Sequence, residues 1–292
     1  MRSPREAGGG TSLSPTLSLL FIAPAAILVL AAFGLPFLLL LALSLASPVE
    51  GSLVPDMSNP TLAAYSRILG DGFYLRTLAT TLAMSLATAA GCLALALPLA
   101  HWLARRAGRA RRVLTAIVLL PLACGALLPT LGLVHLLGPL GVVNGTLRGL
   151  GLIASPLPLL GTQLGIVIGL IQAFLPFAVL PILAVLDRTP PVIEEAAITL
   201  GATPARLWVR IILPLAWPGL LAGGLLVFCS ALTAFVTPQI VGQGKVATFA
   251  MLAYQQALQV LDWPFASALA VTMLAALALA AVVTFSLARL RP

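Results

Sequence analysis

The sequence predicts an all-α, polytopic membrane protein with six transmembrane helices and a helical loop on its cytoplasmic side. Of its 292 residues, 60% are hydrophobic and 8% are charged, and the mean hydropathy of +1.10 is far above that of a soluble domain. Apolar runs near or above the roughly 18 residues that cross a bilayer recur six times. They cover approximately residues 17–45, 77–103, 113–137, 164–186, 219–241 and 265–287.

The first run follows basic residues and contains the small residues 44–46, so it resembles a signal peptide with a cleavage site. The apolar part of a signal peptide spans only about 7–15 residues, and this run is nearly twice as long. We therefore predict a retained helix, broken or kinked near Pro24 or Pro36. Residues 1–16 are predicted to be a flexible cytoplasmic tail, and 17–292 a single transmembrane domain.

The segment between the first two runs, residues 47–76, is expected to lie outside the membrane because it contains acidic residues and three prolines. Its second half begins with Asn59-Pro60, which is typical of a helix start. Apolar residues then follow with helical spacing at Leu62, Tyr65 and Leu69. We predict a short surface helix before the chain enters the membrane.

Three further connections differ in composition. Residues 105–112 are short and basic, and we expect them to set the orientation of the chain in the membrane. Residues 138–161 are rich in Gly and Pro but too apolar for a solvated loop, so they are expected to dip into the protein or to lie along its outer surface. The same is expected of residues 237–245, after the fifth run.

The basic residues are distributed unevenly between the two sides of the predicted membrane domain. If both termini are cytoplasmic, twelve of the sixteen Lys and Arg residues lie on the inner side, and only Arg67, Arg76, Arg148 and Lys245 lie outside. This is the positive-inside bias of membrane proteins. It explains the net charge of +8 without a nucleic-acid partner.

The residues that carry redox, metal or proton chemistry are sparse. The three cysteines lie in apolar runs without a CxxC pair or a nearby His, so neither a metal nor a cofactor is expected. Asp187, Asp262 and both His residues lie at or beyond the ends of the runs. A secondary transporter or channel driven by an ion gradient usually carries an ionisable group within a span, and a membrane enzyme needs a catalytic cluster. Both alternatives are therefore disfavoured.

One stretch mixes charged and apolar residues over two helical lengths. After Leu186, prolines at 190 and 191 interrupt the membrane helix, and a short helix is predicted from about Pro191 to Leu200. Gly201 can adopt a positive φ and end that helix, and Thr203-Pro204 is typical of the start of another. This second helix is predicted to run to about Leu213 and to close at Pro214, which would complete a helical hairpin.

The first helix of this hairpin is predicted to be amphipathic. At 100° per residue, one arc holds Val192, Ile193, Ala196, Ala197 and Leu200, and the opposite arc holds Glu194 and Glu195. Two alanines on the apolar arc would let a partner approach the helix closely.

The spacing of the whole stretch matches a family motif. Glu195-Ala196-Ala197 is followed after three residues by Gly201, and after nine more by Ile211 and then Leu213-Pro214. This pattern resembles the EAA loop in the membrane subunits of bacterial ABC importers that work with a periplasmic binding protein. The wider resemblance covers about residues 62–287. Residues 237–269 are similar to the spermidine/putrescine permease class, whose relatives serve polyamines, opine-like compounds, phosphonates and ferric iron.

The resemblance implies that the chain is a permease in the bacterial inner membrane and that residues 187–217 form its coupling loop. In this family the loop is seated in a groove of a cytoplasmic ATPase dimer. Glu195 would meet a basic group of the ATPase, Ala196 and Ala197 would allow close seating, and Gly201 would set the turn. The other implied partners are a periplasmic binding protein and a second permease subunit, usually a different chain.

Two further expectations concern ATP and the solute. The sequence contains no GxxxxGK[ST] pattern, so the chain is not expected to be an enzyme, and ATP hydrolysis would belong to a separate subunit. Polyamines or related small solutes are the implied cargo. Gln172 and Thr233, predicted to lie in the middle of their spans, are candidates for lining the solute path, although neutral polar residues in spans more often bond to neighbouring helices.

Overall fold

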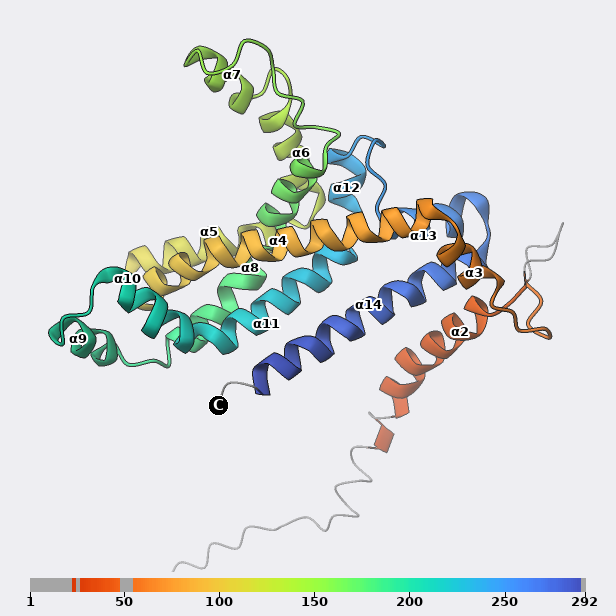
Figure 1. The fold of residues 1–292 in the computed structure, drawn as a ribbon, viewed down its shortest axis with the longest axis horizontal. Coiled ribbons are helices and arrows are strands. Elements are labelled where there is room, and N and C mark those ends of the chain that lie inside the picture. Colours follow the sequence, from red (N-terminus) through yellow and green to blue (C-terminus); the bar gives the residue numbers. More distant parts are fainter. Residues whose placement is uncertain (1–22, 25–26, 48–54, 290–292) are drawn as a thin grey trace, which may run out of the picture.

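The computed structural model describes residues 23–24, 27–47 and 55–289, which form helices joined by short loops (Figure 1). Ser47 and Asp56 form one isolated antiparallel bridge. In chain order the elements are η1 (Leu30–Gly34), α2 (Leu35–Ser44), α3 (Ala63–Gly70), α4 (Gly72–Ala104), α5 (Arg109–Cys124), α6 (Leu127–Leu137), α7 (Val142–Gly149), α8 (Gln163–Leu186), α9 (Val192–Thr199), α10 (Pro204–Leu207), η2 (Trp208–Ile212), α11 (Leu213–Leu232), α12 (Val236–Val241), α13 (Phe249–Gln255), η3 (Gln256–Val260) and α14 (Trp263–Arg289).

Six helical segments of the described chain are long and apolar enough to cross a membrane. They are Ile27–Ser44, Gly72–Ala104, Leu127–Gly149, Gln163–Leu186, Pro204–Leu232 and Trp263–Arg289. This confirms the predicted all-α class and the number of spans. The surface helix predicted after Asn59-Pro60 is also confirmed as α3. The tail predicted at residues 1–16 lies outside the described residues.

The alternative at Pro24 borders residues outside the described chain. An irregularity of the kind predicted for the first span lies at Pro36. This residue stands at the start of α2, directly after the π-helical turn η1. Proline lacks an N–H group, and its ring clashes with the carbonyl of the preceding turn. A widened turn at this point accommodates both constraints.

The third membrane-length segment is Leu127–Gly149, which covers α6 and α7. The apolar run predicted as the third span, residues 113–137, is not a continuous helix. It is divided into α5 and α6 at Gly125, whose φ of +69° is incompatible with a right-handed helix. Figure 1 shows α6 and α7 extending away from the other helices, so residues 142–149 do not dip into the protein as one alternative predicted. By contrast, the predicted insertion of residues 237–245 is confirmed in part, because α12 contacts α6 and α8 and buries Thr237, Pro238 and Val241.

The fifth span differs from the prediction at both ends. Helical structure runs continuously from Pro204 through η2 and α11 to Leu232, so the predicted closure of the loop helix at Pro214 is wrong. The π-helical turn immediately before Pro214 provides the physical reason, because it lets the helix pass a residue without an N–H group. The span also ends nine residues before the predicted Val241, and the chain then turns into α12.

The core of the fold is formed by α4, α8 and α11. Gly219 and Gly223 of α11 face α8 so closely that a Cβ atom at Gly219 would lie 2.8 Å from the Cα of Ile182, and one at Gly223 would lie 3.1 Å from the Cα of Ala178. This GxxxG spacing is the small-residue contact that lets membrane helices pack at short distance. Cys92 and other small residues of α4 are buried in the same cluster.

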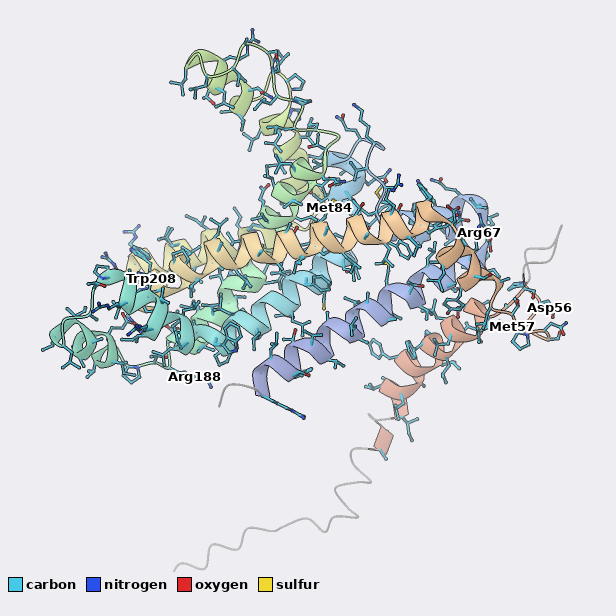
Figure 2. The ribbon with its side chains drawn as sticks, in the orientation of Figure 1. Asp56, Met57, Arg67, Met84, Arg188 and Trp208 are labelled. Carbon is cyan, nitrogen blue, oxygen red and sulfur yellow. The ribbon has the colours of Figure 1, made fainter. Side chains whose placement is uncertain are left out.

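The loops gather at two opposite ends of the molecule. Figure 1 shows α9 and α10 at one end and α3 and α13 at the other. Figure 2 shows Arg188 and Trp208 at the first end and Arg67 at the opposite end. The long helices α4, α8 and α11 therefore connect the loop that carries the family motif with the region predicted to face outward.

Candidate functional site

Gly201 ends α9 in the conformation that the sequence predicts. Its φ is +82°, its N–H donates to the carbonyl of Ile198 at 2.9 Å, and the N–H of Ala202 donates to the carbonyl of Ala197 at 3.0 Å. These two bonds form a Schellman motif, which satisfies carbonyls that the end of a helix leaves free. The next helix starts as expected, with the Thr203 hydroxyl accepting a hydrogen bond from the N–H of Arg206 at 3.4 Å.

The surface of α9 that faces away from the protein is largely apolar. Val192, Ile193 and Ala196 of the predicted apolar arc are exposed, and Leu200 is 88% exposed. Ile198 extends this surface, whereas Ala197 is half-buried. Exposed apolar side chains on adjacent turns of one short helix are typical of a contact site for another protein.

The two carboxylates of α9 occupy different environments, although the helical wheel placed them on the same arc. Glu195 is exposed, and its carboxylate forms no hydrogen bond with the described residues. Glu194 points toward the end of α4, where its carboxylate lies 3.0 Å from Nε2 of His101 and accepts a hydrogen bond from Nε of Arg105 at 2.9 Å. The side chains of these three residues are only 13–18% exposed.

Arg105 also holds the chain on the other side of the loop. One of its terminal nitrogens donates to the carbonyl oxygens of Leu186 at 3.3 Å and Thr189 at 3.2 Å, which end α8 and precede α9. A second ion pair joins Arg111 of α5 to Asp187. The basic segment 105–112 therefore does more than set the orientation in the membrane, because it fixes α9 relative to α4 and α8.

The charge of Glu194 is maintained by its partners. Burial works to raise the pKa of this carboxyl, but the hydrogen bonds and positive charges of Arg105 and His101 outweigh burial and lower the pKa below its ordinary value. Glu194 is therefore ionised at neutral pH. The negative charge of Glu194 at the base of α9 is thus paired with the positive charge of Arg105.

The remaining motif residues lie where the loop continues into the membrane helix. Ile211 lies in η2, while Leu213 and Pro214 are the first two residues of α11. Ile211 is half-buried and the other two are exposed. They therefore mark the junction between a π-helical turn and a membrane span, rather than the end of a helix as predicted.

The two candidates for the solute path are not brought together. Gln172 is exposed on α8, well inside that helix. Thr233 is the residue that follows α11, and its hydroxyl donates to the carbonyl of Cys229 at 3.0 Å. The prediction that Thr233 lies in the middle of a span is thus wrong, because α11 ends one residue earlier.

The described residues bring no three His, Cys, Asp or Glu side chains together as a metal site would require. His101 bonds to Glu194, and His135 is exposed on α6. Cys92 is buried between α4 and α8, where its thiol lies 3.7 Å from the carbonyl of Ile171.

Sequence reasoning missed the anchor formed by His101 and Arg105. Their partner Glu194 is 93 and 89 residues away in the chain, and no local pattern reports such a contact. A signal was nevertheless present. His101 and Arg105 are four residues apart and therefore share one face at the end of α4. Acidic residues are few in the sequence, so a basic pair on the same side as Glu194 could have been matched with it.

Comparison with known proteins identifies relatives of this chain. No protein-family model matches the chain. The "Spermidine/putrescine transport system permease protein PotB" of Escherichia coli K12 is 33% identical over 230 residues, which cover 79% of this chain and 83% of PotB. The "Inner membrane ABC transporter permease protein YdcU" of the same organism is 31% identical over 203 residues, covering 65% of this chain and 64% of YdcU.

A solved structure shares the fold. A chain of the bacterial alginate ABC transporter, crystallised in complex with an alginate pentasaccharide-bound periplasmic protein, aligns with a TM-score of 0.72 over 92% of both chains. The sequence identity is 18%, so this similarity concerns the arrangement of the helices alone.

Proposed function

Because this chain belongs to the permease subunits of ABC importers, we propose that residues 187–217 couple it to a cytoplasmic ATPase. As such a subunit, the chain is a transmembrane component of an ATP-driven importer and is not itself an enzyme. One observation carries the proposal. The helix α9 presents an uncovered apolar face, and its base is fixed to the membrane helices by Glu194.

The contact would use side chains that the rest of the described chain leaves free. Val192, Ile193 and Leu200 supply apolar surface, and the small side chain of Ala196 allows close approach. Glu195 lies beside this surface with an unpaired carboxylate, which suits a basic group of the ATPase. Ala197 is half-buried and would contribute to packing against the loop itself.

The anchors provide two routes from the loop to the core. Glu194 joins the base of α9 to the end of α4 through Arg105 and His101. The chain after Gly201 continues through α10 and η2 directly into α11, with Ile211, Leu213 and Pro214 at the junction. A displacement of the loop by an ATPase would thus reach α4 and α11, which pack against each other and against α8.

The rest of the proposed assembly is supported by family membership together with the sequence. We place the chain in the bacterial inner membrane with both termini in the cytoplasm, because that orientation puts twelve of the sixteen basic residues inside. Two ATPase subunits, a periplasmic binding protein and a second permease subunit, a different chain, complete the importer. Residues 17–292 form the permease domain and 1–16 its cytoplasmic tail.

The solute is the least constrained part of this proposal. The name of PotB makes polyamines or related small solutes the first class to test. Gln172 stays a candidate for the solute path, since its amide is exposed on α8. Thr233 stays a candidate at the end of α11, where it would line the path beside the turn into α12.

Adjacent carboxylates make a matched experiment possible. We expect Glu195→Gln to weaken association with the ATPase, and to lower ATPase activity and solute uptake together, while the loop keeps its structure. Glu194→Gln should instead loosen residues 187–202, because each lost charge-assisted hydrogen bond is worth about 1.5–3 kcal/mol. Uptake should then fall more than ATP hydrolysis, since the ATPase would move a loop that is no longer fixed to α4.

The measurements are uptake and ATP hydrolysis in vesicles that contain the permeases, both ATPases and the binding protein, with hydrogen exchange of residues 187–202 as the structural readout. The purified chain alone serves as the control and should hydrolyse no ATP. Wild-type uptake and hydrolysis in both variants would show that this loop is not the coupling element.

A further inference from the structure

A polar cavity of about 530 Å³ opens at the end of the molecule opposite α9. Its walls come from the beginnings of α4 and α8 and from the loop between α12 and α13. The polar side chains on these walls are Asp71, Arg76, Thr77, Thr80, Gln163 and Lys245. This volume falls within the 300–1,000 Å³ that is usual for small-molecule sites.

The charges of this cavity do not balance. Two cations, Arg76 and Lys245, share it with one carboxylate, Asp71. The carboxylate of Asp71 accepts a hydrogen bond from the N–H of Phe73 at 2.8 Å and thereby caps α4. Neither the guanidinium of Arg76 nor the ammonium of Lys245 forms an ion pair or hydrogen bond with any described residue. The cavity therefore carries an excess of positive charge.

Arg67, a third cation at this end of the molecule, differs from Arg76 and Lys245 because it has partners within the protein. Arg67 lies 4.3 Å above the ring of Phe265 and 3.9 Å from the carboxylate of Asp262. Its charge is thus already engaged within the protein. The excess at the cavity comes from two residues whose charges are left unpaired by the described part of the chain.

The backbone places Lys245 in this position. The N–H of Lys245 donates to the carbonyl of Gly242 at 2.9 Å, and its aliphatic stem lies over Gly161, where a Cβ atom would be only 2.8 Å from Cδ. Gly161 itself adopts a φ of +72° and donates its N–H to the carbonyl of Val241 at 2.8 Å. A glycine with an unusual backbone conformation therefore leaves the space that the lysine stem occupies.

From this geometry we infer that the transported solute carries an anionic group, such as a carboxylate or a phosphate, which Arg76 and Lys245 bind at the outer mouth of the permease. The inference rests on the proposed function of the chain as an importer permease. It assigns an anionic solute in place of the polyamine class that the name of PotB put first. A guanidinium and an ammonium that face one cavity favour an oxyanion. They repel a polyamine, which is itself a polycation.

Lys245 is the only lysine in the sequence, and this allows a direct test. In the assembled importer in lipid nanodiscs without ATP, the rate at which an amine-reactive reagent modifies Lys245 is followed by peptide mass spectrometry, which separates it from the terminal amine. Succinate, inorganic phosphate and spermidine are added in turn. We expect succinate or phosphate to protect Lys245 in a saturable manner and spermidine to leave the rate unchanged.

Variants show whether protection comes from the cavity. Arg76→Gln should raise the half-protecting concentration of the anion about two- to fivefold, the range expected from one exposed charged contact. Arg148→Gln removes a cation from α7, outside the cavity, and should leave protection unchanged.

Three results would overturn the inference. The first is that spermidine protects Lys245 as well as the anions do, and the second is that neither anion protects it in a saturable manner. The third is that the solute-free periplasmic protein alone protects Lys245, which would assign the two cations to protein docking. The labelling needs neither ATP nor a working coupling loop. A failure here with the contrast between Glu194 and Glu195 intact would remove the solute assignment and leave the proposed function standing.

Discussion

Two short helices, α9 and α7, are held by single side chains of opposite character. Each helix has eight residues. Glu194 of α9 is charged, is 13% exposed and binds Arg105 and His101. Asn144 of α7 is neutral and fully buried, donates to the carbonyls of Gly138 at 3.0 Å and Leu157 at 3.2 Å, and accepts from the N–H of Leu157 at 2.7 Å.

The difference shows how the surroundings select the type of anchor. Water near Glu194 can hydrate both charges when the contact opens, so an ion pair there can break and re-form at moderate cost. Asn144 is fully buried, and a charge at that position would lack compensation. An amide that satisfies backbone groups on two segments is the anchor that such a site tolerates. The comparison therefore predicts that the contact at the base of α9 opens more readily than the contact that holds α7.

The largest expected effect is on the neutral anchor. Asn144→Asp replaces an amide that donates to carbonyls by a buried carboxylate that can only repel them, and we expect a loss of about 3–5 kcal/mol in the local stability of α7. Hydrogen exchange of residues 142–157 measures this loss. Thr146→Val, on the exposed side of the same helix, is the control and should change exchange little. Equal effects of the two changes would contradict the role of Asn144 as the anchor.

Matched glycines test whether the two regions differ in function as well as in stability. Gly201 follows α9 with φ +82°, and Gly151 follows α7 with φ +69°; a Cβ atom added at either would meet nothing within 4 Å. Replacing each by Val should therefore cost about 1–3 kcal/mol of backbone strain and no steric clash. We expect only Gly201→Val to reduce the solute imported per ATP hydrolysed in reconstituted vesicles. A similar loss in Gly151→Val would show that coupling is not specific to the α9 loop.

The smallest expected effect is a dependence on pH that only one anchor shows. Because the pKa of Glu194 is lower in the folded loop than in the opened loop, the opened state binds more protons as the solution becomes acidic. The anchor contributes fully above the ordinary pKa of a glutamate and is lost as the pH falls through the lowered value. Arg105 and His101 are the side chains that face this carboxylate.

Asn144 does not titrate, so α7 should show no such dependence. Hydrogen exchange at pH 7 and pH 4, corrected for the intrinsic effect of pH, should reveal faster opening of residues 187–202 in acid, by less than about 1 kcal/mol. A larger acid effect on α7 than on α9 would reverse the comparison.

The sequence predicted features that depend on local chemistry. The six spans followed from apolar length, and the end of α9 followed from Gly201, because glycine adopts the required φ without strain. Features that depend on distant contacts were not predictable in the same way. The helical wheel placed both acids of α9 on one arc, whereas Glu194 is turned toward α4 by groups about 90 residues away.

The predictions of helix boundaries were wrong for a different reason. Proline was taken as the end of the loop helix at Pro214, yet a π-helical turn carries the helix past it. Conversely, the apolar run 113–137 gave no sign that Gly125 would adopt a positive φ and divide α5 from α6. Composition shows that a segment is apolar, but the packing around the segment decides whether its helix continues.

The unbroken helical path from Pro204 to Leu232 has a mechanical consequence. Its 29 residues span about 43 Å at a rise of 1.5 Å per residue, and a tilt of roughly 5° about a point between Gly219 and Gly223 would move the two ends by about 1–2 Å in opposite directions. A rod of this kind acts as a lever whose fulcrum is the close contact of Gly219 and Gly223 with α8. The widened turn η2 lies on the longer arm, between the fulcrum and α10, and its compliance sets how much of a push on α10 arrives at Leu232.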